Sequence, residues 1–359
     1  MKNIMEVDKN FKHQSIDKTD IKLYDVRKEP FKIYGCYLEE SGEKFRRVPE
    51  NVAKNMNDCA YFLHTCTAGV RVRFKTDSQY VALKAVMPTV SLMPAMAVTG
   101  SCGFDLYADG HYFNTFVPPI KYEDRFRATY DVYGGYESII NFPDRKMRDI
   151  IINFPLYSDV SDVILGLQED AKLLEGNKYT YEKPIVFYGS SITEGGSASR
   201  PGNSYEAVIS RRLDSNYLNL GFSGSAVAEK TIAEYISNLD MSVFVYDYDH
   251  NSPNPEHYKK THKPMFDIIR EKNPDLPVIM VTRPNTCQSE QIEERIKIAY
   301  ETYETALKNG DKNVYFINGQ DILNYSDPDM MTVDGCHPND FGFWCMAEVI
   351  GKKIKEVLK

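Results

Sequence analysis

A short apolar run that stops at a glycine and two serines constrains the fold more than any other stretch of this chain. Residues 185–188 (Ile-Val-Phe-Tyr) are β-branched or aromatic and predict a buried strand, and Gly189, Ser190 and Ser191 follow it directly. Residues 203–213 then carry apolar side chains at helical spacing behind an Asn and a Ser that can cap a helix. A strand, a glycine turn and a helix in this order predict a parallel α/β sheet, in which the turn lies at the carboxyl end of the strand, where ligands bind.

The alternation of strand and helix continues to the end of the chain. Further short apolar runs predict buried strands at residues 217–220, 243–246, 278–281 and 314–317. Segments with helical periodicity lie between or after them, at residues 231–239, 255–272, 289–309 and 340–358. Short buried strands with interleaved helices predict a doubly wound, three-layer α/β/α domain, which we place at residues 178–359.

The first half of the chain consists of short alternating runs punctuated by Gly and Pro, without a long amphipathic helix. This pattern predicts an antiparallel β-sandwich domain, which we place at residues 21–177. Within it, residues 70–74 and 80–87 both alternate, and the turn between them predicts a β-hairpin. Residues 1–20 are polar and mostly charged, so we expect a mobile or loosely docked arm.

Two short motifs resemble one known family. The stretch from Gly189 to Thr193 (Gly-Ser-Ser-Ile-Thr) is similar to the first block of the SGNH (GDSL-type) hydrolases, and Ser191 matches the nucleophilic serine of that family. Ser190 stands where the commonest pattern of the family has Asp. The stretch 103–107 (Gly-Phe-Asp-Leu-Tyr) resembles the Gly-x-Asp-Leu-Tyr signature of a β domain that precedes a subset of SGNH esterases. The resemblance implies a flavodoxin-like SGNH hydrolase domain behind a jelly-roll-like β-sandwich.

A third motif supplies the general base that the resemblance requires. Residues 334–338 (Asp-Gly-Cys-His-Pro) precede the last predicted helix and match the Asp-x-x-His block of the family. A neutral His can take the proton of a serine hydroxyl near pH 7 and return it to the leaving alcohol, which we assign to His337. Asp334 can accept a hydrogen bond from the other ring nitrogen. The α/β-hydrolase fold is disfavoured, because Gly-x-Ser-x-Gly is absent and Asp and His lie close together.

The oxyanion hole is predicted from the ends of the second and third strands. Gly224 matches the oxyanion-hole glycine of the family, and the backbone N–H of Ser191 is the second donor that the resemblance implies. The third block departs from the usual Gly-x-Asn-Asp pattern. We assign its amide donor to Asn251, because a carboxamide can donate where a carboxylate cannot, and His250 is the rival donor.

Composition limits the classes of partner and the cellular location that we expect. The net charge of −8 comes without a basic cluster, which argues against nucleic acid as a partner. No run of apolar residues is long enough for a signal peptide or a membrane span, so we expect a cytoplasmic protein that does not bind membranes. The seven cysteines lack paired spacing, so neither disulfides nor a metal site is predicted, and we expect no cofactor. A homo-oligomer is compatible with the sequence.

The resemblance implies a serine carboxylester hydrolase with a small-molecule or oligosaccharide ester as its substrate. Two-domain members resemble carbohydrate acetylesterases, and the loop 194–203 is polar, without the apolar flap of a lipase, so we favour removal of O-acetyl groups from a carbohydrate. Arg200 in this loop, Asp249 and His250 are weaker candidates for substrate contacts. The alternatives are a GDSL-type lipase or thioesterase for longer acyl chains, and a non-catalytic carbohydrate-binding protein.

Overall fold

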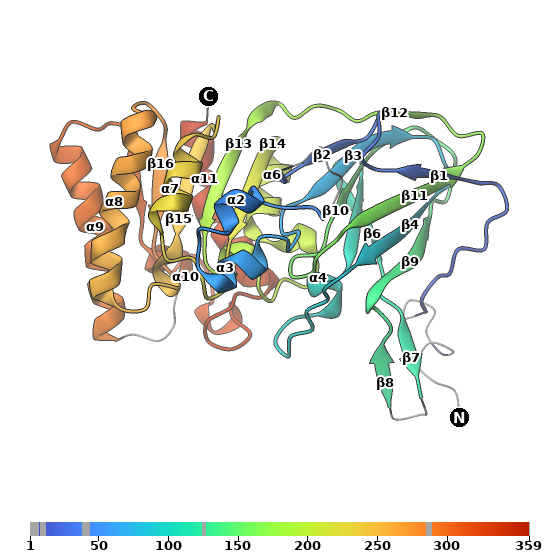
Figure 1. The fold of residues 1–359 in the computed structure, drawn as a ribbon, viewed down its shortest axis with the longest axis horizontal. Coiled ribbons are helices and arrows are strands. Elements are labelled where there is room, and N and C mark those ends of the chain that lie inside the picture. Colours follow the sequence, from blue (N-terminus) through green and yellow to red (C-terminus); the bar gives the residue numbers. More distant parts are fainter. Residues whose placement is uncertain (1–6, 8–11, 38–43, 124–126, 285–288, 359) are drawn as a thin grey trace.

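The computed structural model describes residues 7, 12–37, 44–123, 127–284 and 289–358. A β-rich unit lies beside a unit of helices packed on both faces of a sheet, and the long axis of the molecule runs through both (Figure 1). The link between them lies between β12 (Leu173–Glu175) and β13 (Tyr181–Gly189).

The second unit is built on a parallel sheet with the strand order β14-β13-β15-β16-β17. The remaining strands are β14 (Ser215–Gly221), β15 (Val243–Asp247), β16 (Val278–Val281) and β17 (Val314–Ile317). The apolar core on one face includes side chains of α7 (Lys230–Ser237), α8 (Pro255–Lys272) and α9 (Glu290–Lys308). The core on the other face includes side chains of α6 (Tyr205–Leu213), α10 (Gly319–Leu323) and α11 (Asp340–Val357). The three-layer prediction is confirmed.

Strand β13, which lies between β14 and β15, shows why the sequence forms this layered structure. Successive side chains of a strand point to opposite faces, and here Val186 and Tyr188 join one core while Ile185 and Phe187 join the other. All four side chains are fully buried. A strand buried on both faces needs the continuous apolar run that the sequence has, and cannot have alternating polar residues.

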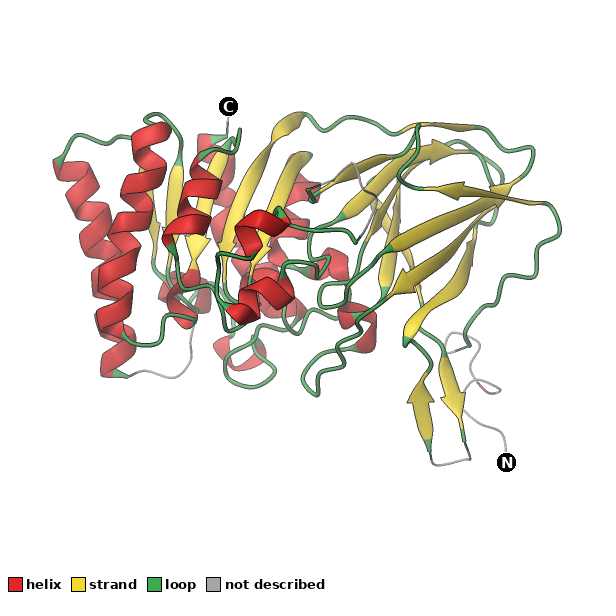
Figure 2. Ribbon diagram, in the orientation of Figure 1, coloured by secondary structure: helices red, strands yellow, loops and turns green. Residues whose placement is uncertain are grey.

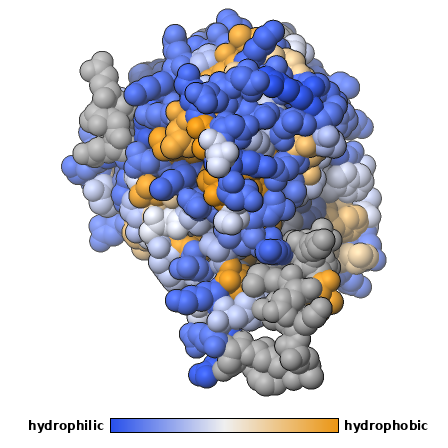
Figure 3. Space-filling model, turned by 90° about the vertical axis from the view of Figure 1, so that its right-hand side faces the viewer, coloured by the Kyte–Doolittle hydropathy of each residue, from blue (hydrophilic) through white to orange (hydrophobic). Residues whose placement is uncertain are grey.

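The first unit is a β-sandwich of two antiparallel sheets (Figure 2). One sheet has the order β1-β11-β4-β9, and the other has the order β12-β3-β10-β5-β6, with β2 paired to β3. Their apolar inner faces form one core. The end of the sandwich that faces away from the second unit is mainly hydrophilic, with small separate apolar patches (Figure 3). The strands are β1 (Ile21–Asp25), β2 (Lys32–Tyr34), β3 (Arg71–Thr76), β4 (Tyr80–Met87), β5 (Phe104–Ala108), β6 (His111–Phe116), β9 (Gly134–Asn141), β10 (Arg148–Asn153) and β11 (Asp162–Gln168); β7 (Ile120–Tyr122) and β8 (Ala128–Tyr130) form a separate hairpin.

The predicted hairpin of residues 70–74 and 80–87 is wrong. Strand β3 pairs with β2, β10 and β12, whereas β4 pairs with β9 and β11 in the opposite sheet. The turn between β3 and β4 therefore crosses the sandwich, and its Ser78 is buried and donates to the carbonyl of Tyr80. Alternation identifies a strand with one buried face, but it does not identify the partner strand.

Part of the first half of the chain belongs in space to the second unit. The short helices α2 (Glu50–Ala53) and α3 (Asp58–Leu63) were not predicted, and Ala53 and Ala60 lie in the same apolar core as α7 and α8. Figure 1 shows both helices in front of the parallel sheet. The segment that contains these two helices thus docks on the α/β unit before the chain returns to the sandwich.

A buried carboxylate of the sandwich joins the two units. Asp105 accepts hydrogen bonds from Arg200 at 2.9 Å and from the backbone N–H of Gly202 at 2.8 Å, both across the boundary. Asn153 donates to its other oxygen at 2.8 Å. The hydroxyl of Tyr107 also bonds Arg200. The Asp and Tyr of the Gly-x-Asp-Leu-Tyr stretch therefore hold the loop of the second unit, rather than satisfying a local turn or only filling the sandwich.

The described part of the N-terminal arm contacts the sandwich. His13 lies 3.3 Å from the carbonyl of Val117, and Asp20 accepts from the hydroxyl of Tyr80 at 3.0 Å. Residues 1–6 and 8–11 of the predicted arm, and Cys287, lie outside the described residues. In the described ranges no helix combines the length and apolarity of a membrane span.

We expect Asp105→Ala to lower the free energy of unfolding by about 3 to 5 kcal/mol, because the variant leaves the guanidinium of Arg200 without its buried partner. Urea unfolding followed by circular dichroism measures the change. The control is Lys183→Ala, which removes an exposed ion pair with Asp240 and should cost less than about 1 kcal/mol. Equal effects of the two substitutions would contradict a joining role for Asp105.

Candidate active site

The candidate nucleophile lies just after the carboxyl end of β13. Ser191 is the first residue of α5 (Ser191–Glu194), which begins two residues after β13 ends. Ser190 is the N-cap, and its hydroxyl accepts from the backbone N–H of Ile192 at 3.2 Å. Ser190 therefore supports the turn. Only the neighbouring hydroxyl is free to face the site.

Gly189 makes this arrangement possible. A Cβ at this position would collide with the carboxylate of Asp247 and with the hydroxyl of Thr193. These two groups are hydrogen-bonded to each other and tie the end of β15 to α5. Burial raises the pKa of Asp247 to about 8, although the hydrogen bond from Thr193 works against this shift. The glycine is therefore required for close packing under the nucleophile.

Ser191, His337 and Asp334 form a continuous hydrogen-bonded chain. The Oγ of Ser191 lies 2.9 Å from Nε2 of His337, although the two residues are 146 positions apart in the sequence. The Nδ1 atom of His337 lies 2.8 Å from Oδ2 of Asp334. Ser191 and His337 are half-buried, so these hydrogen-bonded side chains are accessible to solvent. The structure brings together all three residues that were predicted from two separate motifs.

A tight loop before α11 positions Asp334 and His337. Thr332 and Pro338 form a bridge, and Val333 donates to the carbonyl of His337 at 2.9 Å. Burial would raise the pKa of Asp334, but hydrogen bonds from the backbone N–H and the ring of His337 outweigh it and lower the pKa to about 2. Because an ionised carboxylate only accepts, Nδ1 carries the ring proton, and Nε2 is left to accept from Ser191.

The predicted oxyanion donors lie at neighbouring strand ends. The N–H groups of Ser191 and Gly224 have no acceptor among the described residues. Gly224 has a φ of +67°, and no atom lies within 4 Å of the position of a Cβ. Asn251 follows β15, and its Oδ1 accepts from the N–H of Ala226 at 3.2 Å. This bond turns the carbonyl side of the amide toward the glycine loop and leaves the N–H₂ group without a partner in the described part of the chain.

His250 is oriented differently from Asn251. Its Nδ1 lies 3.7 Å from the sulfur of Cys336, the residue before His337. Its Nε2 is buried and has no partner among the described residues. Burial, and then the charge of Arg283, lower the pKa of His250 well below its usual value, so the ring is neutral. His250 therefore lies beside the loop that carries His337, and its role as the rival donor stays a prediction.

Two weaker substrate candidates have structural partners instead. The side chain of Asp249 is fully buried and pairs with Arg283 at 3.4 Å, and Arg295 donates to its carbonyl at 2.7 Å. Arg200 pairs with Asp105 and lies over the ring of Tyr112, with 3.8 Å to the ring centroid. Both side chains thus have structural partners, and contacts of Asp249 and Arg200 with a substrate stay predictions. A polar residue in a sequence gives no indication of a partner that is far away in the chain.

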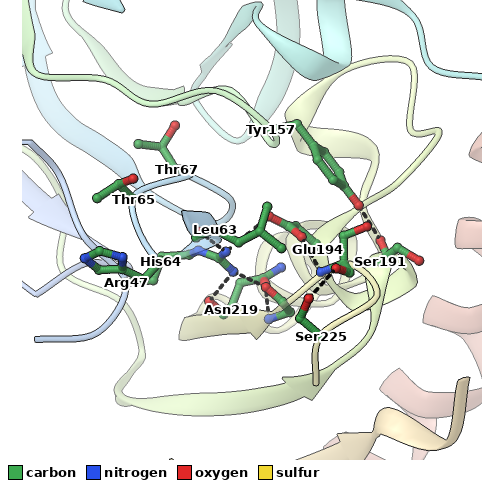
Figure 4. Close-up of polar contacts among 12 residues, drawn as sticks. Arg47, Leu63, His64, Thr65, Thr67, Tyr157, Ser191, Glu194, Asn219 and Ser225 are labelled. Atoms are coloured by element: carbon green, nitrogen blue, oxygen red, sulfur yellow. Dashed lines mark hydrogen bonds and ion pairs between the residues drawn. The ribbon is translucent and has the colours of Figure 1, made fainter. Parts of the chain in front are cut away.

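Several residues near the site were not predicted. Tyr157, from the loop after β10, donates to the carbonyl of Ser191 at 3.0 Å. Arg47 and Glu194 form a fully buried ion pair at 3.1 Å, immediately behind the nucleophile helix (Figure 4). Tyr157 and Arg47 both come from the first half of the chain, where the sequence had indicated only a β-sandwich.

An open groove of about 690 Å³ reaches the site at Tyr157 and Ser223. Its walls are mainly apolar and come from α3 and from the loop after β4. The lining includes Phe62, Leu63, Val90, Leu92, Met93 and Tyr133. The loop 194–203 is polar, as its sequence indicates, but the first half of the chain supplies an apolar wall that was not predicted. In the described residues no group of His, Cys, Asp and Glu could hold a metal ion.

Comparison with known proteins agrees with this geometry. Residues 182–355 match the model of the GDSL-like lipase/acylhydrolase family, and residues 21–173 match GxDLY, the N-terminus of SGNH-hydrolase-type esterases. The chain belongs to the SGNH (GDSL-type) hydrolases, in the subset with the GxDLY domain. Among curated proteins, none matches this sequence.

Solved structures with the same two-domain fold cover nearly the whole chain. A candidate GDSL-like lipase of Bacteroides ovatus is 27% identical, with a TM-score of 0.82, and the match covers 94% of this chain and 99% of that one. A salicylyl-acyltransferase from a tetracycline biosynthetic pathway is 18% identical, with a TM-score of 0.73 and coverage of 94% and 98%. An acetyl xylan esterase of Butyrivibrio proteoclasticus is 10% identical, with a TM-score of 0.59 and coverage of 94% and 98%. The last two share the fold alone.

Proposed function

We propose that the protein is a serine carboxylester hydrolase that removes O-acetyl groups from a carbohydrate. The observation that carries the proposal is the hydrogen bond between Ser191 and His337, continued to Asp334. A serine hydroxyl is a weak nucleophile until a base accepts its proton, and a neutral imidazole with Nε2 toward the hydroxyl can do so. A non-catalytic carbohydrate-binding protein would not need these two hydrogen bonds.

The proposed reaction proceeds through an acyl-enzyme. The Oγ of Ser191 attacks the ester carbonyl carbon while its proton moves to Nε2 of His337. The carbonyl oxygen becomes negatively charged, and the N–H groups of Ser191 and Gly224 and the amide of Asn251 donate to it. The tetrahedral intermediate breaks its bond to the alcohol oxygen, which takes the proton from His337. Water then attacks the acyl group, with His337 again as the base, and releases the acid and free Ser191. Asp334 orients the ring and stabilises the imidazolium.

The substrate class rests on the site and on the shared architecture. The site is open to solvent and the loop 194–203 is polar, which suits a hydrated alcohol such as a sugar. The resemblance in fold to the acetyl xylan esterase supports this choice. The apolar groove at Tyr157 and Ser223 favours a second candidate, an esterase for longer or aromatic acyl groups, because such a groove can bury additional methylene groups, each worth about 0.8 kcal/mol.

A panel of esters with one alcohol and rising acyl length separates the two substrate classes. If the protein is an acetylesterase, kcat/KM is highest for the acetyl ester and decreases as the chain grows, and acetylated oligosaccharides are turned over. If the groove binds the acyl chain, kcat/KM increases from acetyl to octanoyl, by up to about tenfold per two methylene groups. The Ser191→Ala protein is the blank. An increase with acyl length would contradict the acetylesterase proposal.

The donor from the third strand end is tested by two substitutions in neighbouring residues. We expect Asn251→Ala to lower kcat by about 100-fold, because one donor to the oxyanion is lost, and His250→Ala to have a much smaller effect. Steady-state kinetics on the best ester measure both. The control is Asn254→Ala, which removes an amide that caps α8 in the same loop. If His250→Ala is the damaging change and Asn251→Ala is nearly silent, the assignment of Asn251 is wrong.

A further inference from the structure

Arg47 reaches from the first half of the chain to the end of the second strand of the parallel sheet. Its guanidinium is fully buried and donates to the carbonyl of Gly221, the last residue of β14, and to the carbonyl of Leu63 at 2.7 Å. It also lies over the ring of Phe222, with 4.9 Å to the ring centroid. Figure 4 shows Arg47 beside Asn219 and Glu194, a short way from Ser191. An arginine with these contacts fixes the backbone immediately before the glycine loop.

Glu194 connects Arg47 to the two segments that carry the predicted backbone donors, the helix with Ser191 and the loop with Gly224. It is the last residue of the nucleophile helix α5, and its Oε1 pairs with Arg47 at 3.1 Å. Its Oε2 accepts from the backbone N–H of Ser223 at 2.8 Å. Ser223 immediately precedes Gly224. The ion pair therefore links the helix that carries Ser191 to the loop that carries Gly224.

A second contact from the same half of the chain holds the far side of the loop. Asn57 caps α3, and its side-chain N–H₂ donates to the carbonyl of Ser225 at 2.9 Å. Gly224 lies between these two attachments and has no neighbour within 4 Å of a Cβ position. The loop is thus attached on both sides of Gly224, through Glu194 and Arg47 before it and through Asn57 after it. Arg47 and Asn57 both come from the first half of the chain.

Stability alone does not explain a buried ion pair in this place. Taking two charges out of water costs several kcal/mol per ion, and a well-packed apolar pair is often as stable. The fork of an arginine can, however, bind a carboxylate and backbone carbonyls in one fixed geometry, which neither an apolar side chain nor a lysine can do. The arrangement is therefore suited to orienting the N–H groups of the loop.

We propose that Arg47 is a positioning residue for the oxyanion hole: through Glu194 and the carbonyl of Gly221 it holds the loop so that the N–H of Gly224 meets the developing oxyanion. The first half of the chain thereby completes the site of the second. The inference rests on the proposed esterase function. It requires that loss of Arg47 weakens binding of the transition state much more than binding of the substrate. The reason is that the oxyanion exists only in the transition state and the tetrahedral intermediate.

The test compares Arg47→Lys with Arg71→Lys. Arg71 is a matched control, since it is also buried, comes from the same half of the chain, and donates across the boundary to Asn216 at 2.7 Å and to the carbonyl of Tyr217 at 3.2 Å, near the start of β14. Glu194→Gln is a second variant of nearly unchanged shape. Three quantities are measured for each protein: kcat and KM on the best ester, and the inhibition constant of phenylboronic acid, whose tetrahedral adduct with serine places a negative oxygen in the hole.

For Arg47→Lys and Glu194→Gln we expect kcat to decrease by about 10- to 100-fold, KM to change by less than about threefold, and the boronate inhibition constant to increase in proportion to the loss of kcat. Arg71→Lys should leave all three within about threefold of wild type. Thermal unfolding identifies variants that fail to fold. If Arg47→Lys does not fold, the kinetics and boronate inhibition of a folded Glu194→Gln protein test the inference.

Folded Arg47→Lys and Glu194→Gln proteins with wild-type kcat and boronate inhibition would overturn the inference. So would equal losses in Arg47→Lys and Arg71→Lys, which would indicate general loosening of the domain contact. A wild-type protein that neither hydrolyses esters nor binds the boronate would overturn the proposed function together with the inference, so the two failures are distinguishable.

Discussion

The hydrogen bond between Ser191 and His337 joins the end of β13, an interior strand of the parallel sheet, to the loop before the last helix. It forms only if β13 lies between β14 and β15 in the sheet, and if α11 packs on the face that carries α6. The close packing at Gly189 and the tight turn of residues 331–339 set the two ends of this bond. The doubly wound sheet therefore provides a frame that brings side chains from distant segments to one edge.

The sheet alone does not complete the site. Arg47 and Asn57 fix the glycine loop, Tyr157 binds the carbonyl of Ser191, and apolar side chains of the sandwich half form one wall of the groove. The ion pair between Asp105 and Arg200 holds the two units together. The β domain is thus part of the site in a physical sense: removal of its buried side chains would leave charged and polar groups of the α/β unit without partners.

Most of the α/β unit could be predicted because its strands are short, continuous apolar runs and polar residues follow each of them. The runs at 278–281 and 314–317 match β16 and β17 residue for residue. The sandwich was harder, because alternation at 70–74 and 80–87 fits a hairpin as well as a crossing between sheets. The pairs Arg47–Glu194 and Asp105–Arg200 could not be predicted at all, since charged residues buried with a partner have no pattern that distinguishes them from solvated ones.

The central claim is that Ser191, and not the adjacent Ser190, is the nucleophile. A fluorophosphonate probe followed by mass spectrometry of the peptide spanning residues 184–200 tests it most directly, because the probe bonds the serine oxygen that is activated by the base. The account predicts an adduct on Ser191, complete loss of labelling in Ser191→Ala, and retained labelling in Ser190→Ala. An adduct on Ser190, or full labelling of Ser191→Ala, would contradict it.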